Sequence, residues 1–207
     1  MPLPTFAPPS EPPVRSATLT RPQAAGRLGI SPAGVDKLVR AGVLDVPIAT
    51  GRVEELALRD PLQVVDGELT VLRIDARAEA YPGEDRKYIG FHVAHSNDEL
   101  EQSSLRWWRS DPARVLDNVL LAVTLATFPV AVYRVTNRVN EKYREGEDQP
   151  RHHYAGQLLA RVHPGMQAEH LKNAPGHLRE LAKQIMASRI TVSSGGPIGY
   201  LEPTAAG

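Results

Sequence analysis

The sequence predicts an α+β protein in two parts: an N-terminal helix-turn-helix head, followed by a mixed, mainly antiparallel sheet or small barrel domain with helices. Two observations carry this prediction. Two short amphipathic helices occupy residues 21–44, and from residue 68 onward the apolar spacing changes from helical to alternating. The expected organisation is a disordered Pro-rich leader at 1–16, the head at 17–65, the α+β domain at 66–192 and a flexible tail at 193–207.

Composition restricts the possible functions. The 207 residues carry 24 Lys and Arg against 24 Asp and Glu, so any basic site must be local. Cysteine is absent, which excludes disulfides, thiolate metal sites and cysteine nucleophiles and is compatible with a reducing cytoplasm. The most apolar stretch, residues 119–135, contains Pro129 and is too short to span a bilayer. We therefore expect a cytoplasmic protein without membrane contact.

The first 16 residues contain six prolines, a composition that cannot pack a core and predicts the disordered leader. Residues 21–44, RPQAAGRLGISPAGVDKLVRAGVL, follow as two helices joined by a tight turn. Gly29 can adopt the left-handed backbone conformation that commonly ends a helix. Ser31 and Pro32 are suited to the cap and first turn of the second helix. The apolar positions at helical spacing should face inward; they are Ala24, Ala25, Leu28, Val35, Leu38 and Val39. The second helix then presents Ala33, Asp36, Lys37 and Arg40 outward.

This stretch resembles the winged helix-turn-helix heads of the MerR and excisionase families. The matching pattern is AA..LGIS...V..L.R.G.L, and Gly51-Arg52 lies where those heads place a Gly-Arg in the wing. The resemblance covers residues 18–65 and implies that the second helix enters the major groove of double-stranded DNA. It also implies that the outer face of this helix contacts bases or phosphates and that Arg52 contacts the DNA backbone. The residues of the outer face are Ser31, Ala33, Asp36, Lys37 and Arg40.

The head carries little net charge. Between residues 15 and 60, seven Lys and Arg stand against five Asp and Glu, and Glu54-Glu55 closely follows the expected wing contact. Because affinity for DNA depends strongly on the number of phosphate contacts, one head alone should bind weakly. We therefore expect a homodimer on DNA.

In the larger domain, strands are expected from residue 68, covered on both faces, and at 87–93. Ser96 and Glu99 have the spacing of a capping box, so a helix should begin there and continue through LEQSSLRWWRS. Asp111-Pro112 begins another helical turn. The remaining expected elements are two apolar antiparallel strands separated by a Phe128-Pro129 corner, a polar loop at 139–151, a strand at 152–162 and a helix at 176–188.

The adjacent tryptophans are the most unusual feature of this domain. Neighbouring residues on a helix are about 100° apart, so one tryptophan should lie in the core and the other at a boundary or pocket. Either they anchor a helix on the sheet, or aromatic and guanidinium planes sandwich a base or another flat group. The residues of this candidate second nucleic-acid or ligand site are Trp107, Trp108, Arg109, Arg114 and Arg134.

The order of elements over residues 68–163 is similar to the PUA and EVE type of small barrel, which implies binding of RNA or modified DNA bases. Tyr88-Ile89-Gly90 matches only half of the GIY-YIG nuclease signature, and we expect no enzyme activity, cofactor or metal. The sequence thus predicts a DNA-binding regulator of transcription or of phage or plasmid accessory type. Two alternatives stay open: a non-enzymatic protein–protein assembly module, and a PUA/EVE-like nucleic-acid or modified-base reader. A small-molecule ligand is left unspecified.

Overall fold

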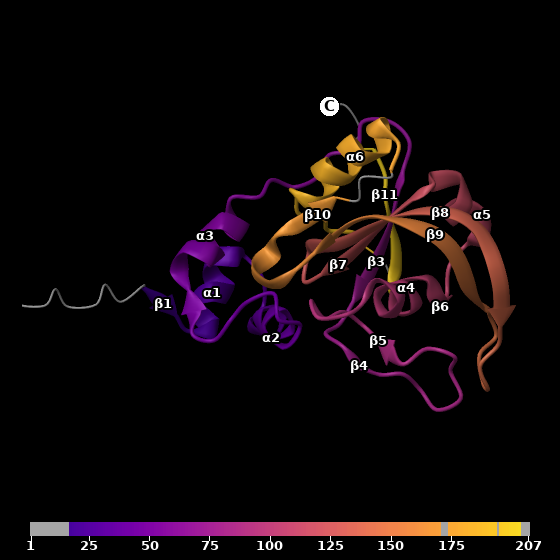
Figure 1. The fold of residues 1–207 in the computed structure, drawn as a ribbon, viewed down its shortest axis with the longest axis horizontal. Helices are drawn as coiled ribbons and strands as arrows, with labels where there is room; N and C mark the ends of the chain where they lie inside the picture. The colour runs from indigo at the N-terminus through magenta and orange to yellow at the C-terminus, as the bar shows by residue number, and fades with distance from the viewer. Residues whose placement is uncertain (1–16, 171–173, 194, 204–207) are drawn as a thin grey trace, which may run out of the picture.

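The computed structural model describes residues 17–170, 174–193 and 195–203 and has a cluster of short helices beside a curled, half-barrel sheet (Figure 1). The mixed α+β class is therefore confirmed. The expected leader at 1–16 lies outside the described residues. None of the helices in the described ranges has the length and apolar character needed to cross a membrane.

The helical end contains α1 (Arg21–Leu28), α2 (Pro32–Arg40) and α3 (Thr50–Ala57). Beside them, β1 (Thr18–Leu19) pairs antiparallel with β2 (Ile48–Ala49). The expected wing is wrong, because the residues after β2 form the helix α3. The physical reason is that Val53 and Leu56, three positions apart, are both fully buried on one face of that helix.

The sheet has the strand order β10 (Ala168–His170), β9 (Arg151–Val162), β8 (Phe128–Lys142), β7 (Leu120–Leu125), β3 (Leu69–Ile74) and β11 (Ile198–Leu201). Its strands pair antiparallel except for β3 and β7, which are parallel, so the mainly antiparallel expectation is confirmed. The predicted tail differs from the structure, since β11 is hydrogen-bonded to β3. Two further short strands, β4 (Ala78–Glu79) and β5 (Tyr88–Ile89), form a separate ladder, so the strand expected at 87–93 is much shorter.

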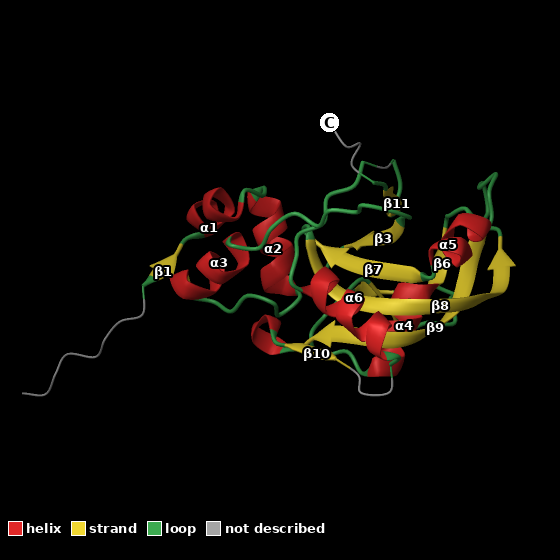
Figure 2. Ribbon diagram, turned by 90° about the horizontal axis from the view of Figure 1, so that it is seen from above, coloured by secondary structure: helices red, strands yellow, loops and turns green. Residues whose placement is uncertain are grey.

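Helices pack along this sheet, as seen from above in Figure 2. They are α4 (Asn97–Leu105), α5 (Pro112–Asn118) and α6 (Gly176–Met186), and a 3₁₀ turn, η1 (Pro164–Met166), follows β9. The predicted capping box is confirmed, because Ser96 and Glu99 bond each other's backbone N–H groups. Asp111 accepts hydrogen bonds from the first turn of α5, as its sequence position indicates.

The helix expected to run through the tryptophans is wrong, because α4 ends at Leu105. Arg106–Trp108 instead form the short strand β6, which pairs with β9. Trp107 has a φ of 67° and the register shifts beside it. Pairing with β9 and burial of both indoles, which are only 5% and 6% exposed, favour the strand, as aromatic residues commonly do.

The hairpin between β7 and β8 turns at Ala126 and Thr127, whose φ values are 49° and 79°. The expected corner at Phe128-Pro129 is therefore wrong by two residues, since both residues lie inside β8 and pair with β7. Two positive φ values in a two-residue connection are typical of the primed turns that match strand twist. The antiparallel pairing of β7 and β8 itself is confirmed.

The head and the sheet share one continuous apolar core. At their junction the backbone N–H of Val93 donates to the carbonyl of Ala41 over 3.0 Å. Gly42, the next residue, has a φ of 72°, and a Cβ there would lie 2.7 Å from the Val93 side chain. In the segment between α3 and β3, the Leu62 N–H donates to the Arg189 carbonyl, and the Arg189 N–H donates to the Asp60 carbonyl. The end of α2 is thus fixed to the sheet part by backbone contacts.

Gly42→Ala should lower the free energy of unfolding by about 1–3 kcal/mol, because it adds strain at a positive φ and a clash with Val93. Gly26→Ala, in α1, is the matched control: nothing lies within 4 Å of the added Cβ, so it should stabilise the protein by about 0.5–1 kcal/mol. Urea unfolding of both variants measures the difference. Equal effects of the two substitutions would contradict the described junction.

A buried acid ties the β4–β5 loop to the long β8–β9 hairpin. The Glu84 side chain is 4% exposed and accepts hydrogen bonds from Arg86, at 2.7 Å, and from Arg144. Lys142 Nζ lies 3.9 Å away. Burial raises the pKa of Glu84, but the hydrogen bonds from Arg144 and Arg86 outweigh it and hold the pKa below its ordinary value. Three positive charges from two segments thus converge on one carboxylate.

Glu84→Gln should destabilise the protein at pH 7 by about 3 kcal/mol, because it leaves the fully buried Arg86 without its charge partner. The pKa of Glu84 is lowered on folding, so its contribution is present above the unfolded-state pKa and is lost as pH falls through the folded-state pKa. The stability gap between wild type and variant should therefore narrow below about pH 4.5. Thermal unfolding from pH 7 to pH 3 measures this gap, and a gap that stays constant would contradict the assignment.

Candidate nucleic-acid interface

The two helices that the sequence singled out are positioned by their caps. Thr20 and Gln23 form a reciprocal capping box at the start of α1, which ends at Gly29 in the left-handed region, φ 62°. The Ser31 hydroxyl accepts the Gly34 N–H over 3.2 Å at the start of α2. The inner faces are buried largely as expected: Ala24, Ala25, Leu28, Val35 and Leu38 are at most 3% exposed, whereas Val39 is only partly buried against the core.

The outer face of α2 is only partly open. Ser31, Ala33 and Arg40 are exposed, whereas Asp36 and Lys37 are partly covered. Asp36 forms an ion pair with Arg21 at 2.5 Å, and Lys37 Nζ lies 2.7 Å from Asp75 in the sheet part. Arg40 forms no ion pair with a described residue. Of the two cations of α2, Lys37 therefore has a carboxylate partner and Arg40 has none.

Arg52 lies on α3 and pairs with Glu55 of the same helix at 2.5 Å. Glu54 pairs with Arg27 of α1 at 2.6 Å. Glu54 and Glu55 therefore both form ion pairs with arginines of the helical end. Because α3 replaces the wing, the structure gives Arg52 a helical position and an intrahelical partner.

Sequence reasoning missed His92, which the fold brings beside the end of α2, and two cations near Tyr88, Arg77 and Lys87. A Cβ at Gly42 would lie 3.5 Å from Nε2 of His92. Burial lowers the pKa of His92, and the charge of nearby Arg77 lowers it further. Arg77 and Lys87 each lie 4.8 Å from the Tyr88 ring centroid. No sequence signal links these residues to α2, because the link depends on the junction at Val93.

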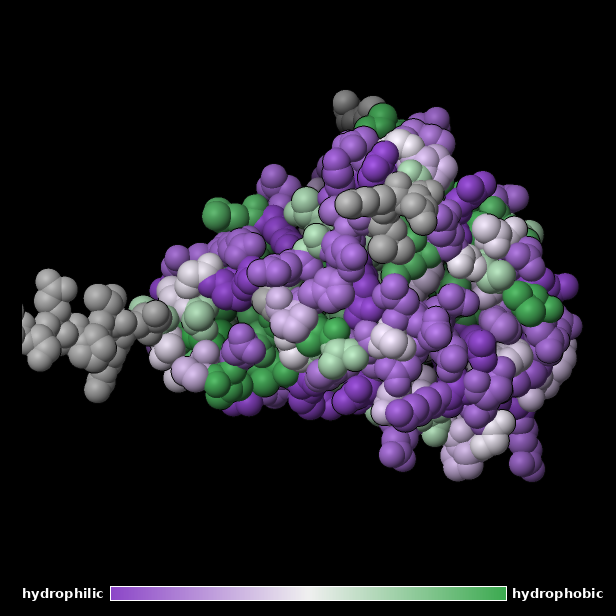
Figure 3. Space-filling model, viewed as in Figure 1, coloured by the Kyte–Doolittle hydropathy of each residue, from purple (hydrophilic) through white to green (hydrophobic). Residues whose placement is uncertain are grey.

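Lys87 is partly balanced by Glu99, whose carboxylate lies 3.7 Å from its ammonium group. Arg77 is exposed and, like Arg40, makes no ion pair to a described residue. Figure 3 shows hydrophobic residues gathered over the helical end of one face and a mostly hydrophilic surface over the sheet end.

The two tryptophans have different surroundings. Trp108 belongs to the main apolar core, with the Arg86 guanidinium 5.3 Å from its ring. Trp107 lies outside that core: its indole N–H donates to Asp85 over 2.5 Å, and the Lys142 ammonium lies 4.0 Å from its ring. The expected division into a core and a boundary tryptophan assumed a helix; in the strand β6 both side chains are nearly fully buried, and only their contacts differ.

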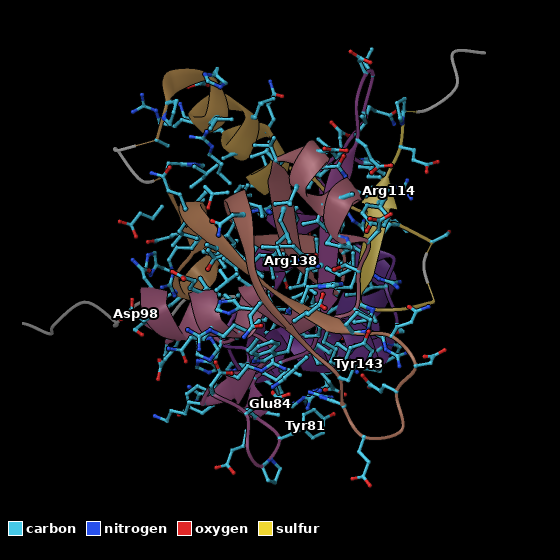
Figure 4. The ribbon with its side chains drawn as sticks, turned by 90° about the vertical axis from the view of Figure 1, so that its right-hand side faces the viewer. Tyr81, Glu84, Asp98, Arg114, Arg138 and Tyr143 are labelled. Carbon is cyan, nitrogen blue, oxygen red and sulfur yellow. The ribbon has the colours of Figure 1, made fainter. Side chains whose placement is uncertain are left out.

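The three arginines of the candidate second site are dispersed. Arg109 lies 3.6 Å from both Glu147 and Asp148 on the β8–β9 connection. Arg114 bonds Glu68 and Glu202 and stacks 3.9 Å from the Tyr200 ring. In Figure 4 it lies at the opposite end of the view from Glu84 and Tyr81.

Arg134 is exposed on β8, opposite Gln157 of β9, and forms no ion pair to a described residue. The structure thus brings Arg109 near the tryptophans and places Arg114 apart from them. Within the described ranges, no group of three or more histidine and carboxylate side chains has the arrangement of a metal site.

Comparison of the chain with protein-family models, with curated proteins and with solved structures finds no match.

Proposed function

We propose that this protein binds double-stranded DNA through α2 as a regulator, in the manner implied by its resemblance to MerR and excisionase heads. The observation that carries the proposal is a capped amphipathic helix with a buried inner face and an exposed end at Arg40, whose charge has no partner among the described residues. An unmatched arginine on such a helix is suited to a phosphate or a guanine edge.

The neighbouring sheet part supports the same proposal. Most cations of the head are already paired with carboxylates, so the head alone offers few phosphate contacts. His92 lies beside the end of α2, and the nearby charge of Arg77 acts on it, so Arg77 adds a positive group close to that end. A duplex on α2 would therefore be held by both parts of the chain, and a homodimer would double these contacts.

Arg40→Gln should weaken binding to a duplex selected from a random pool by about tenfold, because it removes one charge-assisted contact. If the contact is to phosphate, the plot of log affinity against log salt should become shallower by about one unit. Arg77→Gln should have the same effect on the salt dependence. Fluorescence anisotropy between 50 and 200 mM salt, a range in which phosphate contacts are strongly screened, measures both quantities.

Arg179→Gln is the matched control, since Arg179 lies on α6 and makes no ion pair to a described residue. It should leave DNA affinity and salt dependence unchanged. The double variant Lys37→Ala and Arg40→Ala should abolish specific binding. Retention of wild-type affinity by this double variant would remove α2 from the interface.

A PUA/EVE-like base reader is the second candidate, favoured by the curled sheet and the long β8–β9 hairpin. Its base site would require movement of side chains, because Trp107 is covered by Lys142 and held by Asp85. The reader would be supported if the protein binds 5-methylcytosine duplexes more tightly than unmodified ones and if Trp107→Phe reduces this preference. Equal binding of both duplexes would argue against it.

A further inference from the structure

A cleft lies between α2 and the sheet. Its volume is about 380 Å³, within the range of roughly 300–1,000 Å³ for small-molecule sites. It is lined by the carboxyl ends of β3 and β7, the parallel strand pair, and by parts of the segment 190–197. In open α/β sheets, the carboxyl ends of parallel strands are a frequent place for ligands.

The charges of the wall suit an anion. Lys37 and Arg73 contribute two positive charges and Asp75 one negative charge. The Arg73 guanidinium donates to the backbone carbonyls of Val192 and Gly196, so Lys37 is the cation that a ligand would contact. The Lys37 side chain is 36% exposed, and its partner Asp75 is 65% exposed. Ion pairs this open to water contribute little to stability, so a ligand anion can replace Asp75 beside Lys37 at small cost.

The hairpin turn between β7 and β8 is part of the same wall. Thr127 is β-branched and has a φ of 79°, a region that such residues rarely occupy. Its hydroxyl oxygen is buried and has no hydrogen-bond partner among the described residues. A buried polar atom without a partner calls for an explanation, and a ligand group at this wall is one. Thr124 also lines the cleft, but its buried hydroxyl donates to the Leu72 carbonyl over 3.3 Å.

The rest of the wall is apolar. Ile74, Ala126, Ile190 and Val192 border the cleft between its polar groups. A bare inorganic ion would leave this surface in contact with water, whereas an organic group would bury part of it. The wall therefore favours an anion with an apolar portion.

We propose that this cleft binds a small organic anion whose carboxylate or phosphate group contacts Lys37 and the Thr127 hydroxyl. The site itself does not depend on DNA binding. Its regulatory consequence rests on the proposed function: Lys37 also lies on the helix assigned to DNA, so the bound anion competes with a DNA phosphate for the same ammonium group and lowers DNA affinity.

The test uses the full chain, isotopically labelled, with phenyl phosphate, benzoate and inorganic phosphate as separate probes followed by NMR. Phenyl phosphate or benzoate should shift the backbone amide signals of Asp75, Ala126 and Thr127 saturably, with a Kd below about 1 mM. Inorganic phosphate should bind more weakly. The comparison of the two organic probes identifies the preferred head group.

Lys37→Gln should weaken binding of the better probe by about tenfold, because it removes the charge-assisted contact. Arg27→Gln is the matched control: it breaks another exposed ion pair of the head, with Glu54, outside the cleft. Thr127→Val should weaken the probe severalfold without lowering the unfolding temperature, since it removes a buried hydroxyl that has no partner in the described structure.

Absence of saturable shifts with all three probes would overturn the site, as would equal affinity of wild type and Lys37→Gln. These titrations contain no DNA, so their failure leaves the proposed function standing. Conversely, if no duplex binds, the titrations still decide whether the cleft takes an anion.

Discussion

The junction between α2 and the sheet determines how the rest of the molecule can act. A backbone hydrogen bond from Val93 to Ala41 and the Lys37–Asp75 pair connect the two parts over one continuous core. The helix that resembles a DNA-reading element is therefore held at a fixed angle to the sheet. Any duplex that reaches α2 must fit against the sheet part as well, so the sheet constrains which approach is possible. This geometry differs from that of a reading head on a flexible tether.

Local rules account for the elements that could be predicted from the sequence. Ser31, Ser96 with Glu99, and Asp111 each cap a helix through a side-chain contact within three residues, and such contacts need no knowledge of distant segments. The inward apolar faces of α1 and α2 follow from spacing alone. The antiparallel β7–β8 pair could be anticipated because its strands are adjacent in the chain, although the turn itself was displaced by two residues.

The remainder depends on contacts between distant segments. Arg106–Trp108 form a strand because β9 lies beside them, and α3 replaces a wing because its apolar face meets the rest of the head. Glu84 lies in a turn-like YPGED stretch, and its side chain is buried beside Lys142 and Arg144 of the β8–β9 hairpin. Of the candidate site, the exposure of Arg40 followed from the helical pattern. The pairing of Lys37 with Asp75 and the nearness of His92 and Arg77 to α2 required the fold.

The strand β11 has a consequence for how the sheet is completed. Leu72 of β3 pairs with Ile198, which lies 126 residues later in the sequence. Until that segment has been synthesised, β3 has an open edge with unpaired backbone groups, and its apolar residues are available to other chains. Closing a contact across so long a loop is also slow compared with forming the β7–β8 hairpin. The β3 edge is thus exposed to pairing with other chains until β11 has been added.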